Sequence, residues 1–183
     1  MGMNIGIDLD TTLIKLPHME IASKEFGVNF NETDVQDWAF QKGFTELFRK
    51  RIFELFSDPV IMCEKIVPID GTQNKIREWF NRGFNLNVIT SRADILQFKT
   101  VEMISILYPE ISSVHFCPIN KDKNEILIDK KIDIFIDDGP HNIESALKLK
   151  NINCIMISNK YTRYNWHLRG IVNWKKSISE INL

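Results

Sequence analysis

Four groups of polar side chains stand directly after short apolar segments of this 183-residue chain. They are Asp8 with Asp10, Thr90 with Ser91, Lys121 with Lys123, and Asp137 with Asp138. Carboxylates can act as nucleophiles, as general acids and bases, or as ligands of hard cations. Hydroxyls at a helix start and lysines bind phosphate. In this order, the four groups indicate chemistry on a phosphorylated molecule.

Each group also has a purely structural interpretation. Asp8 and Asp10, two residues apart at the end of an apolar strand, can face one cavity, but one of them could instead cap a following helix. Thr90 and Ser91 could be a simple N-cap, and either lysine could point into solvent. The adjacent acids Asp137 and Asp138 favour a metal role more directly, because carboxylates beside a buried strand are costly unless they are paired or bound to a cation.

The elements that must position these groups follow from the apolar pattern. Short β-branched runs predict strands, and stretches with apolar residues at helical spacing predict helices. The predicted strands cover residues 4–9, 84–89, 113–117, 132–136 and 154–157, with helices at about 94–107 and 142–150. Strands alternating with helices predict a parallel sheet, and ligands bind at the carboxyl ends of such strands. Three of the predicted strands end at that edge in Asp8 and Asp10, in Thr90 and Ser91, and in Asp137 and Asp138. The two lysines lie in the loop after the strand at 113–117, and the order of the strands decides whether these groups meet.

Residues 14–67 interrupt the alternation with helical signals alone. Phe44, Leu47, Phe48, Ile52, Leu55 and Phe56 have amphipathic helical spacing over residues 43–56. A further helix is expected between Pro17 and Gly27. We therefore predict an α/β core formed by residues 1–13 and 68–183, with a helical cap formed by residues 14–67 after the first strand.

The cysteine spacing indicates a reducing compartment, and the net charge indicates no strong attraction to polyanions. Cys63, Cys117 and Cys154 are far apart and have no metal-knuckle spacing, which argues against a disulfide framework. The net charge of −1 gives no strong field toward nucleic acid or an anionic membrane. Neither a leader nor a membrane-length apolar run is recognisable. We expect a cytoplasmic protein that binds neither a nucleic acid polymer nor a membrane; a homodimer is compatible with the sequence.

The four groups together resemble the motifs of the haloacid dehalogenase-like (HAD) phosphohydrolases. Asp8-Leu9-Asp10-Thr11-Thr12-Leu13 resembles the first motif, Thr90 the hydroxyl of the second, and Asp137-Asp138 the acidic fourth. Lys121 resembles the third-motif lysine, because its distance from the preceding strand fits better than that of Lys123. The resemblance implies a Rossmann-like three-layer core with a parallel sheet.

The 5′(3′)-deoxyribonucleotidases (5′-nucleotidase type C) are the most similar subfamily. Pro68-Ile69-Asp70-Gly71 fits their turn before the second core helix, Thr90-Ser91 their second motif, and Ile136-Asp137-Asp138-Gly139-Pro140 their fourth. Their chain length and their small helical cap also agree. Thr11 departs from the pattern, because the family usually has glycine there.

The resemblance implies a magnesium-dependent phosphatase that hydrolyses (deoxy)nucleoside monophosphates. Asp8 would form an aspartyl-phosphate, and Asp10 would act as general acid and base. Asp8, the backbone carbonyl of Asp10, and Asp138 would hold Mg²⁺, with Asp137 as a supporting acid. Thr90, Ser91 and Lys121 would bind phosphate.

The predicted cap would select the substrate, and Trp38 and Phe40 in it either stack on a base or pack the cap's own core. A sugar phosphate or another small phosphomonoester is the alternative substrate. A catalytically silent nucleotide-binding module is the alternative to an enzyme. A phospho-acceptor receiver domain is disfavoured, because its acidic pair follows the first strand.

Overall fold

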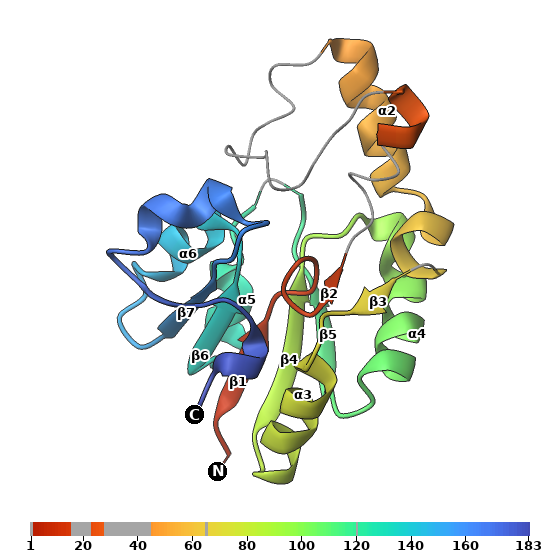
Figure 1. The fold of residues 1–183 in the computed structure, drawn as a ribbon. Helices are drawn as coiled ribbons and strands as arrows, with labels where there is room; N and C mark the ends of the chain where they lie inside the picture. Colours follow the sequence, from red (N-terminus) through yellow and green to blue (C-terminus); the bar gives the residue numbers. More distant parts are fainter. Residues whose placement is uncertain (1, 16–22, 28–44, 65, 120) are drawn as a thin grey trace.

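The computed structural model describes residues 2–15, 23–27, 45–64, 66–119 and 121–183 (Figure 1). Six strands form one sheet in the order β5-β4-β1-β6-β7-β8, and every neighbouring pair is parallel. The strands are β1 (Asn4–Ile7), β4 (Asn85–Thr90), β5 (Ser113–Phe116), β6 (Ile134–Asp137), β7 (Asn153–Ile157) and β8 (Asn173–Lys175). The predicted parallel α/β core is confirmed.

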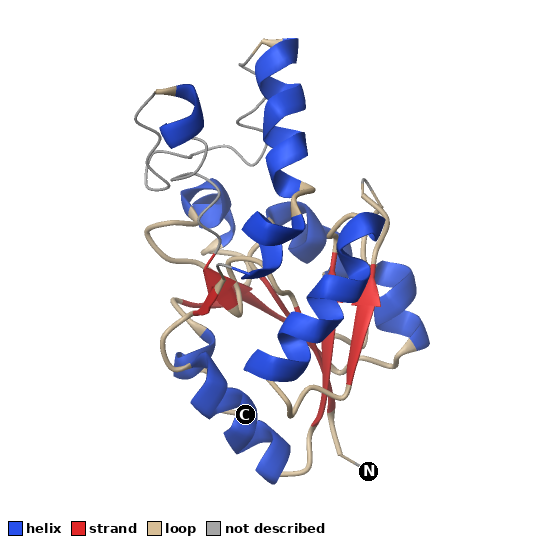
Figure 2. Cartoon of the chain, turned by 90° about the vertical axis from the view of Figure 1, so that its right-hand side faces the viewer, coloured by secondary structure: helices blue, strands red, loops and turns tan. Residues whose placement is uncertain are grey.

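Helices cover both faces of the sheet, which gives three layers (Figures 1 and 2). One face packs against α3 (Thr72–Asn81) and α4 (Gln97–Leu107), and the other packs against α5 (Asn124–Asp129) and α6 (Pro140–Ala146). Strand side chains alternate between the two cores: Ile134 and Ile136 belong to the first, and Phe135 belongs to the second. Because both faces are covered, the inner strands β6 and β7 are mostly apolar rather than alternating.

The register brings the carboxyl ends of three strands together in the middle of the sheet. Ile7 of β1 lies opposite Val88 of β4 and Ile136 of β6. The Asp8 backbone N–H then donates to the Ile136 carbonyl at 2.8 Å, which extends the β1–β6 ladder by one residue. Asp8 and Asp137 therefore leave the sheet side by side, with Thr90 on the other neighbour of β1.

The segment predicted as a cap starts and ends in a small sheet of its own. Strand β2 (Ile14–Lys15) pairs antiparallel with β3 (Val67–Pro68). Between them the structure describes helical residues 23–26, α2 (Glu46–Phe56) and the π-helical turn η3 (Val60–Glu64). The division into a core and a cap of residues 14–67 stays a prediction.

Several elements differ from the sequence prediction. The apolar pattern predicts no helix between residues 117 and 132, but this stretch contains α5, whose Leu127 is buried in the second core. Helix α6 begins at Pro140, earlier than expected, because proline fits the first turn of a helix. The C-terminal tail contributes β8 and the 3₁₀ turns η5 (Arg163–Leu168) and η6 (Ile178–Glu180). Of the helices within the described ranges, none has the length and apolar character needed to cross a membrane.

Gly6 in the central strand is a sensitive point of this packing. A Cβ atom at Gly6 would lie 2.9 Å from the Ile89 Cδ1 atom and 3.2 Å from Ile132 Cγ2. We expect Gly6→Ala to lower the free energy of unfolding by about 1–3 kcal/mol, because overpacking forces neighbours out of their rotamers. Urea unfolding measures the change.

Gly170→Ala is the matched control, because nothing lies within 4 Å of a Cβ atom at Gly170. Its effect should stay within about 0.5 kcal/mol. Equal effects of the two substitutions would contradict the close packing around Gly6.

Candidate active site

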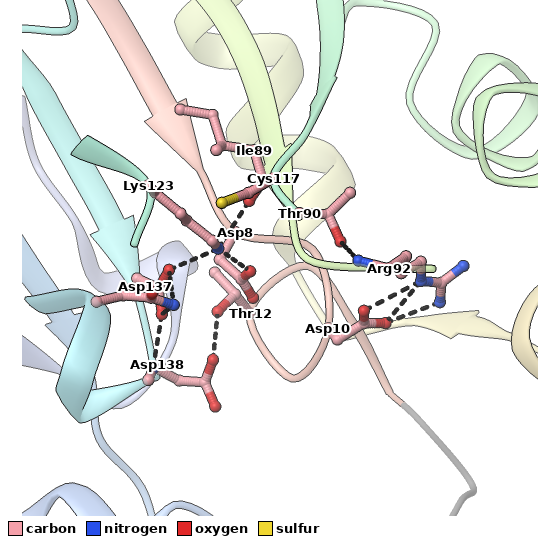
Figure 3. Close-up of polar contacts among 12 residues, drawn as sticks. Asp8, Asp10, Thr12, Ile89, Thr90, Arg92, Cys117, Lys123, Asp137 and Asp138 are labelled. Carbon is pink, nitrogen blue, oxygen red and sulfur yellow. Dashed lines mark hydrogen bonds and ion pairs between the residues drawn. The ribbon is translucent and has the colours of Figure 1, made fainter. Parts of the chain in front are cut away.

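A buried ammonium group joins the ends of β1 and β6. Lys123 lies at the start of α5, and its Nζ is 2.5 Å from Asp8 Oδ1 and 2.8 Å from Asp137 Oδ2 (Figure 3). The same Nζ donates to the Ile89 carbonyl at 2.8 Å, so β4 also contributes. The Lys123 side chain is only 1% exposed, and a buried charge of this kind requires such partners.

The lysine predicted to bind phosphate, Lys121, is exposed, and Lys123 is the lysine that reaches the carboxylates. The chain turns after β5 through Cys117, whose thiol donates to the Asp122 carbonyl at 3.2 Å. This turn places residue 123, rather than 121, at the base of α5 facing the sheet. Distance along the chain was a poor guide because the loop folds back on itself.

The carboxylate of Asp137 is fully engaged by its surroundings. Besides Lys123, it accepts a hydrogen bond at 2.6 Å from the Gly139 backbone N–H. The Asn142 side chain, in the first part of α6, donates to both carboxylate oxygens at 3.1 and 3.2 Å. Asp137 and Asp8 thus hold the Lys123 ammonium between them.

Asp138 is surrounded by hydroxyl groups. Thr11 and Tyr164 both donate to Asp138 Oδ2, and Thr12 donates to Oδ1 at 3.3 Å. Asn165 donates to the Asp138 backbone carbonyl at 2.7 Å. Since Tyr164 and Asn165 belong to η5, the C-terminal tail orients this carboxylate.

Thr11 has an unusual backbone conformation for its residue type. Its φ of 62° lies in the left-handed region, where a β-branched residue is strained. A glycine would adopt this conformation without strain. In this chain the strain is accompanied by a contact that glycine cannot make, the hydroxyl bond to Asp138.

Three carboxylates in this site fit a hard divalent cation. Asp8, Asp137 and Asp138 can each offer an oxygen, and these oxygens lie within 4.8 Å of one another. Carboxylate oxygens are the ligands that Mg²⁺ prefers. Three carboxylates against the single Lys123 ammonium leave a formal excess of two negative charges, which one such ion would balance.

The pKa shifts of the buried acids and of Lys123 come from burial and from the charges of their neighbours. Burial raises the pKa of Asp8 well above its usual value, even though the Lys123 ammonium opposes the shift. Burial, followed by the charge of Asp137, raises the pKa of Asp138 to about 6. Although burial alone would lower it, the pKa of Lys123 is held above its usual value by Asp137 and Asp8. The cluster therefore has an excess of negative charge that the Lys123 ammonium does not neutralise.

Asp10 points away from this cluster. Its carboxylate is bound by Arg92, which follows β4, with Nη2 2.7 Å from Oδ1 (Figure 3). Thr90 is buried at the end of β4, and its hydroxyl accepts from the Arg92 backbone N–H at 3.3 Å. Ser91 is exposed beside it. The structure thus brings Asp8, Asp137 and Asp138 together and places Asp10 in a separate ion pair.

Two of the predicted site residues, Trp38 and Phe40, lie outside the described residues. Sequence reasoning missed Arg92, Tyr164 and Asn142 as neighbours of the site. Arg92 offered a signal, as the charged residue directly after Thr90-Ser91. Tyr164 offered none, because its contact with Asp138 depends on how η5 packs.

Comparison with known structures identifies the class of fold. A predicted phosphatase from Clostridium acetobutylicum superimposes with a TM-score of 0.67 at 16% identity, covering 95% of this chain and 93% of that one. An Entamoeba histolytica HAD hydrolase of family IA, variant 3, gives 0.63 at 15% identity, with coverages of 100% and 96%. The fold is that of the haloacid dehalogenase-like hydrolases.

Sequence comparison identifies the family within that class. Residues 2–181 match the family described as 5′ nucleotidase, deoxy (pyrimidine), cytosolic type C protein, and the chain belongs to this family. Phosphoserine phosphatase of Methanocaldococcus jannaschii is 28% identical over 110 residues, or 57% of this chain. The match spans about half of that relative, 52% of its length.

The buried position of Lys123 predicts a large effect of its removal. We expect Lys123→Met to lower the free energy of unfolding by about 3–5 kcal/mol, because Asp8 and Asp137 would lose their buried cationic partner. Urea unfolding in metal-free buffer measures this loss.

Lys121→Met provides the matched control, since the Lys121 side chain is exposed. It should change the free energy of unfolding by less than about 0.5 kcal/mol. A larger loss in the Lys121 variant than in the Lys123 variant would refute the assignment of Lys123.

The hydroxyl of Tyr164 predicts an effect on cation binding. Removing a group that orients a metal ligand typically weakens affinity by about 10–100-fold. We expect Tyr164→Phe to weaken Mg²⁺ binding by that order, as measured by isothermal titration calorimetry. Tyr161→Phe, at an exposed ring beside Lys160, should bind as the parent protein does. Unchanged affinity in both variants would argue against Asp138 as a ligand.

Proposed function

We propose that the protein is a magnesium-dependent phosphatase that hydrolyses (deoxy)nucleoside monophosphates to nucleoside and phosphate. The observation that carries the proposal is the position of Asp8. Its carboxylate lies at the centre of the sheet edge, beside a buried ammonium and a pair of acids, and Asp10 follows two residues later. The family match and the small-phosphoester relative support hydrolysis of a phosphomonoester.

In the proposed reaction, Asp8 is the nucleophile. A carboxylate oxygen of Asp8 forms a bond to phosphorus as the bond to the nucleoside oxygen breaks, and the Asp10 carboxyl donates its proton to that oxygen. In the second step a water molecule attacks the aspartyl-phosphate and gives a proton to the Asp10 carboxylate. The bond between Asp8 and phosphorus then breaks, and inorganic phosphate leaves.

Asp8, Asp138 and the backbone carbonyl of Asp10 would hold Mg²⁺, with Asp137 beside them. When bound, Mg²⁺ would neutralise charge on the phosphoryl oxygens. Thr90 and Ser91 would hold the phosphate from the end of β4. Lys123, rather than Lys121, would offset negative charge next to the nucleophile, because its Nζ lies 2.5 Å from Asp8 Oδ1.

Residues 14–67 would determine the leaving group. Segments that close over a phosphoryl site exclude water and choose the substrate, and β2 and β3 join this segment to the chain directly after Asp10 and before α3. A different small phosphomonoester is the second candidate, favoured by the similarity to a phosphoserine phosphatase. Both candidates use the same chemistry and differ only in the substrate.

Phosphate release from a substrate panel tests the proposal. The panel holds deoxy- and ribonucleoside 5′- and 3′-monophosphates, sugar phosphates and phosphoserine, each with Mg²⁺ and with chelator. We expect hydrolysis of nucleotides that requires Mg²⁺, and a loss of about a thousandfold or more in Asp8→Asn.

Asp70→Asn serves as the control, because the Asp70 side chain is 97% exposed and has no part in the proposed reaction. It should retain the parent rate. Hydrolysis of phosphoserine or sugar phosphates alone would replace the nucleotide proposal with the second candidate. A folded, Mg²⁺-saturated protein that releases no phosphate from any ester would indicate a silent binding module.

A further inference from the structure

The Arg92 guanidinium binds the Asp10 carboxylate through two nitrogen atoms. Nε lies 3.2 Å from Oδ1 and 3.0 Å from Oδ2, and Nη2 lies 2.7 Å from Oδ1. Such forked contacts fix the direction of a carboxylate as well as its position. The Arg92 side chain is 1% exposed, while that of Asp10 is 24% exposed. The carboxylate is therefore bound by a buried cation and is itself partly open to solvent.

Arg92 is itself held from two further elements. Its Nη1 donates to the Thr100 hydroxyl of α4 at 3.2 Å and contacts the Cys63 sulfur of η3 at 3.5 Å. Its backbone N–H donates to the Thr90 hydroxyl. These contacts fix the guanidinium, which in turn favours one orientation of the Asp10 carboxylate.

Stability alone is a weak reason for this arrangement. A buried ion pair is often no more stabilising than apolar residues of the same volume, because desolvation offsets the attraction. Here the anionic partner is the carboxylate two residues from the nucleophile proposed above, in the same loop at the sheet edge. An orienting role explains both the buried cation and its partly exposed partner.

We propose that Arg92 is a positioning residue that orients Asp10 for proton transfer, an inference that rests on the proposed phosphatase function. Arg92 touches neither the nucleophile nor the leaving group and acts through Asp10. In the first step, as the Asp10 proton moves to the leaving oxygen, the carboxylate that forms faces the guanidinium. In the second step, the same contact directs that carboxylate toward the water whose proton it takes.

The way the rate of hydrolysis depends on the leaving group distinguishes a positioning role of Arg92 from a purely structural one. An alkyl oxygen needs a proton as it leaves, whereas 4-nitrophenolate leaves without one. The value of kcat/KM reports the steps up to and including departure of the leaving group, so it reports the first chemical step of this reaction. A misoriented Asp10 therefore harms alkyl phosphates, while general damage to the site harms both kinds of ester.

The experiment compares kcat/KM for 4-nitrophenyl phosphate and for the best alkyl phosphate of the panel. We expect Arg92→Met to lower the alkyl value by about 100-fold, the usual contribution of a general acid, and the aryl value by less than about tenfold. Arg92→Lys should recover part of the alkyl rate. In an Asp10→Asn background, Arg92→Met should cause little further loss, since both changes remove the same function.

A second variant covers the case in which Arg92→Met does not fold. Thr100→Val removes only the hydroxyl that contacts Nη1, and it should lower the alkyl value more than the aryl value, though by less than Arg92→Met. Equal losses on both esters, or losses additive with Asp10→Asn, would overturn the role of Arg92 and leave the phosphatase function intact. A wild-type protein that hydrolyses neither ester would overturn both.

Discussion

The attraction between the Lys123 ammonium and two carboxylates connects the parts of this site. Asp8 comes from β1, Asp137 from β6 and Lys123 from the base of α5, and none of them would be tolerated alone in so buried a place. The contact requires β1 to lie between β4 and β6 in the observed register. Close packing around Gly6 accompanies that register, since a Cβ atom there would lie 2.9 Å from Ile89 Cδ1.

A second ion pair divides the first motif into two regions. Asp8 and Asp10 are two residues apart, yet one faces Lys123 and the other faces Arg92. The left-handed conformation of Thr11 turns the chain immediately afterwards and brings its hydroxyl to Asp138. Two carboxylates with different cationic partners can take different parts in one reaction, as a nucleophile and a proton-transfer group must.

The sequence predicted most of the core and part of the site. Apolar runs followed by acids or hydroxyls identified β1, β4 and β6, because strands buried on both faces have a strong signal. The interior position of Lys123 was not predictable, since it depends on a turn closed by the Cys117 thiol. Tyr164 and Asn142 were missed for a related reason: their contacts depend on how η5 and α6 pack, which local pattern does not encode. Arg92 directly follows the recognised Thr90-Ser91 motif, but its importance is visible only in its contact with Asp10.

The pairing of β2 with β3 has a consequence for how such chains diverge. Ile14 faces Pro68 and Lys15 faces Val67 across a ladder that is separate from the six-stranded sheet. The two ends of the intervening segment are thus already adjacent, like the two strands of a hairpin whose loop has grown very long. The pairing lets the segment leave the core and rejoin it at one place. Its last part is also tied to the site, because Cys63 of η3 contacts Arg92. Under the proposed function, changes of substrate selectivity would fall between these two attachments, apart from the strands that carry the acids.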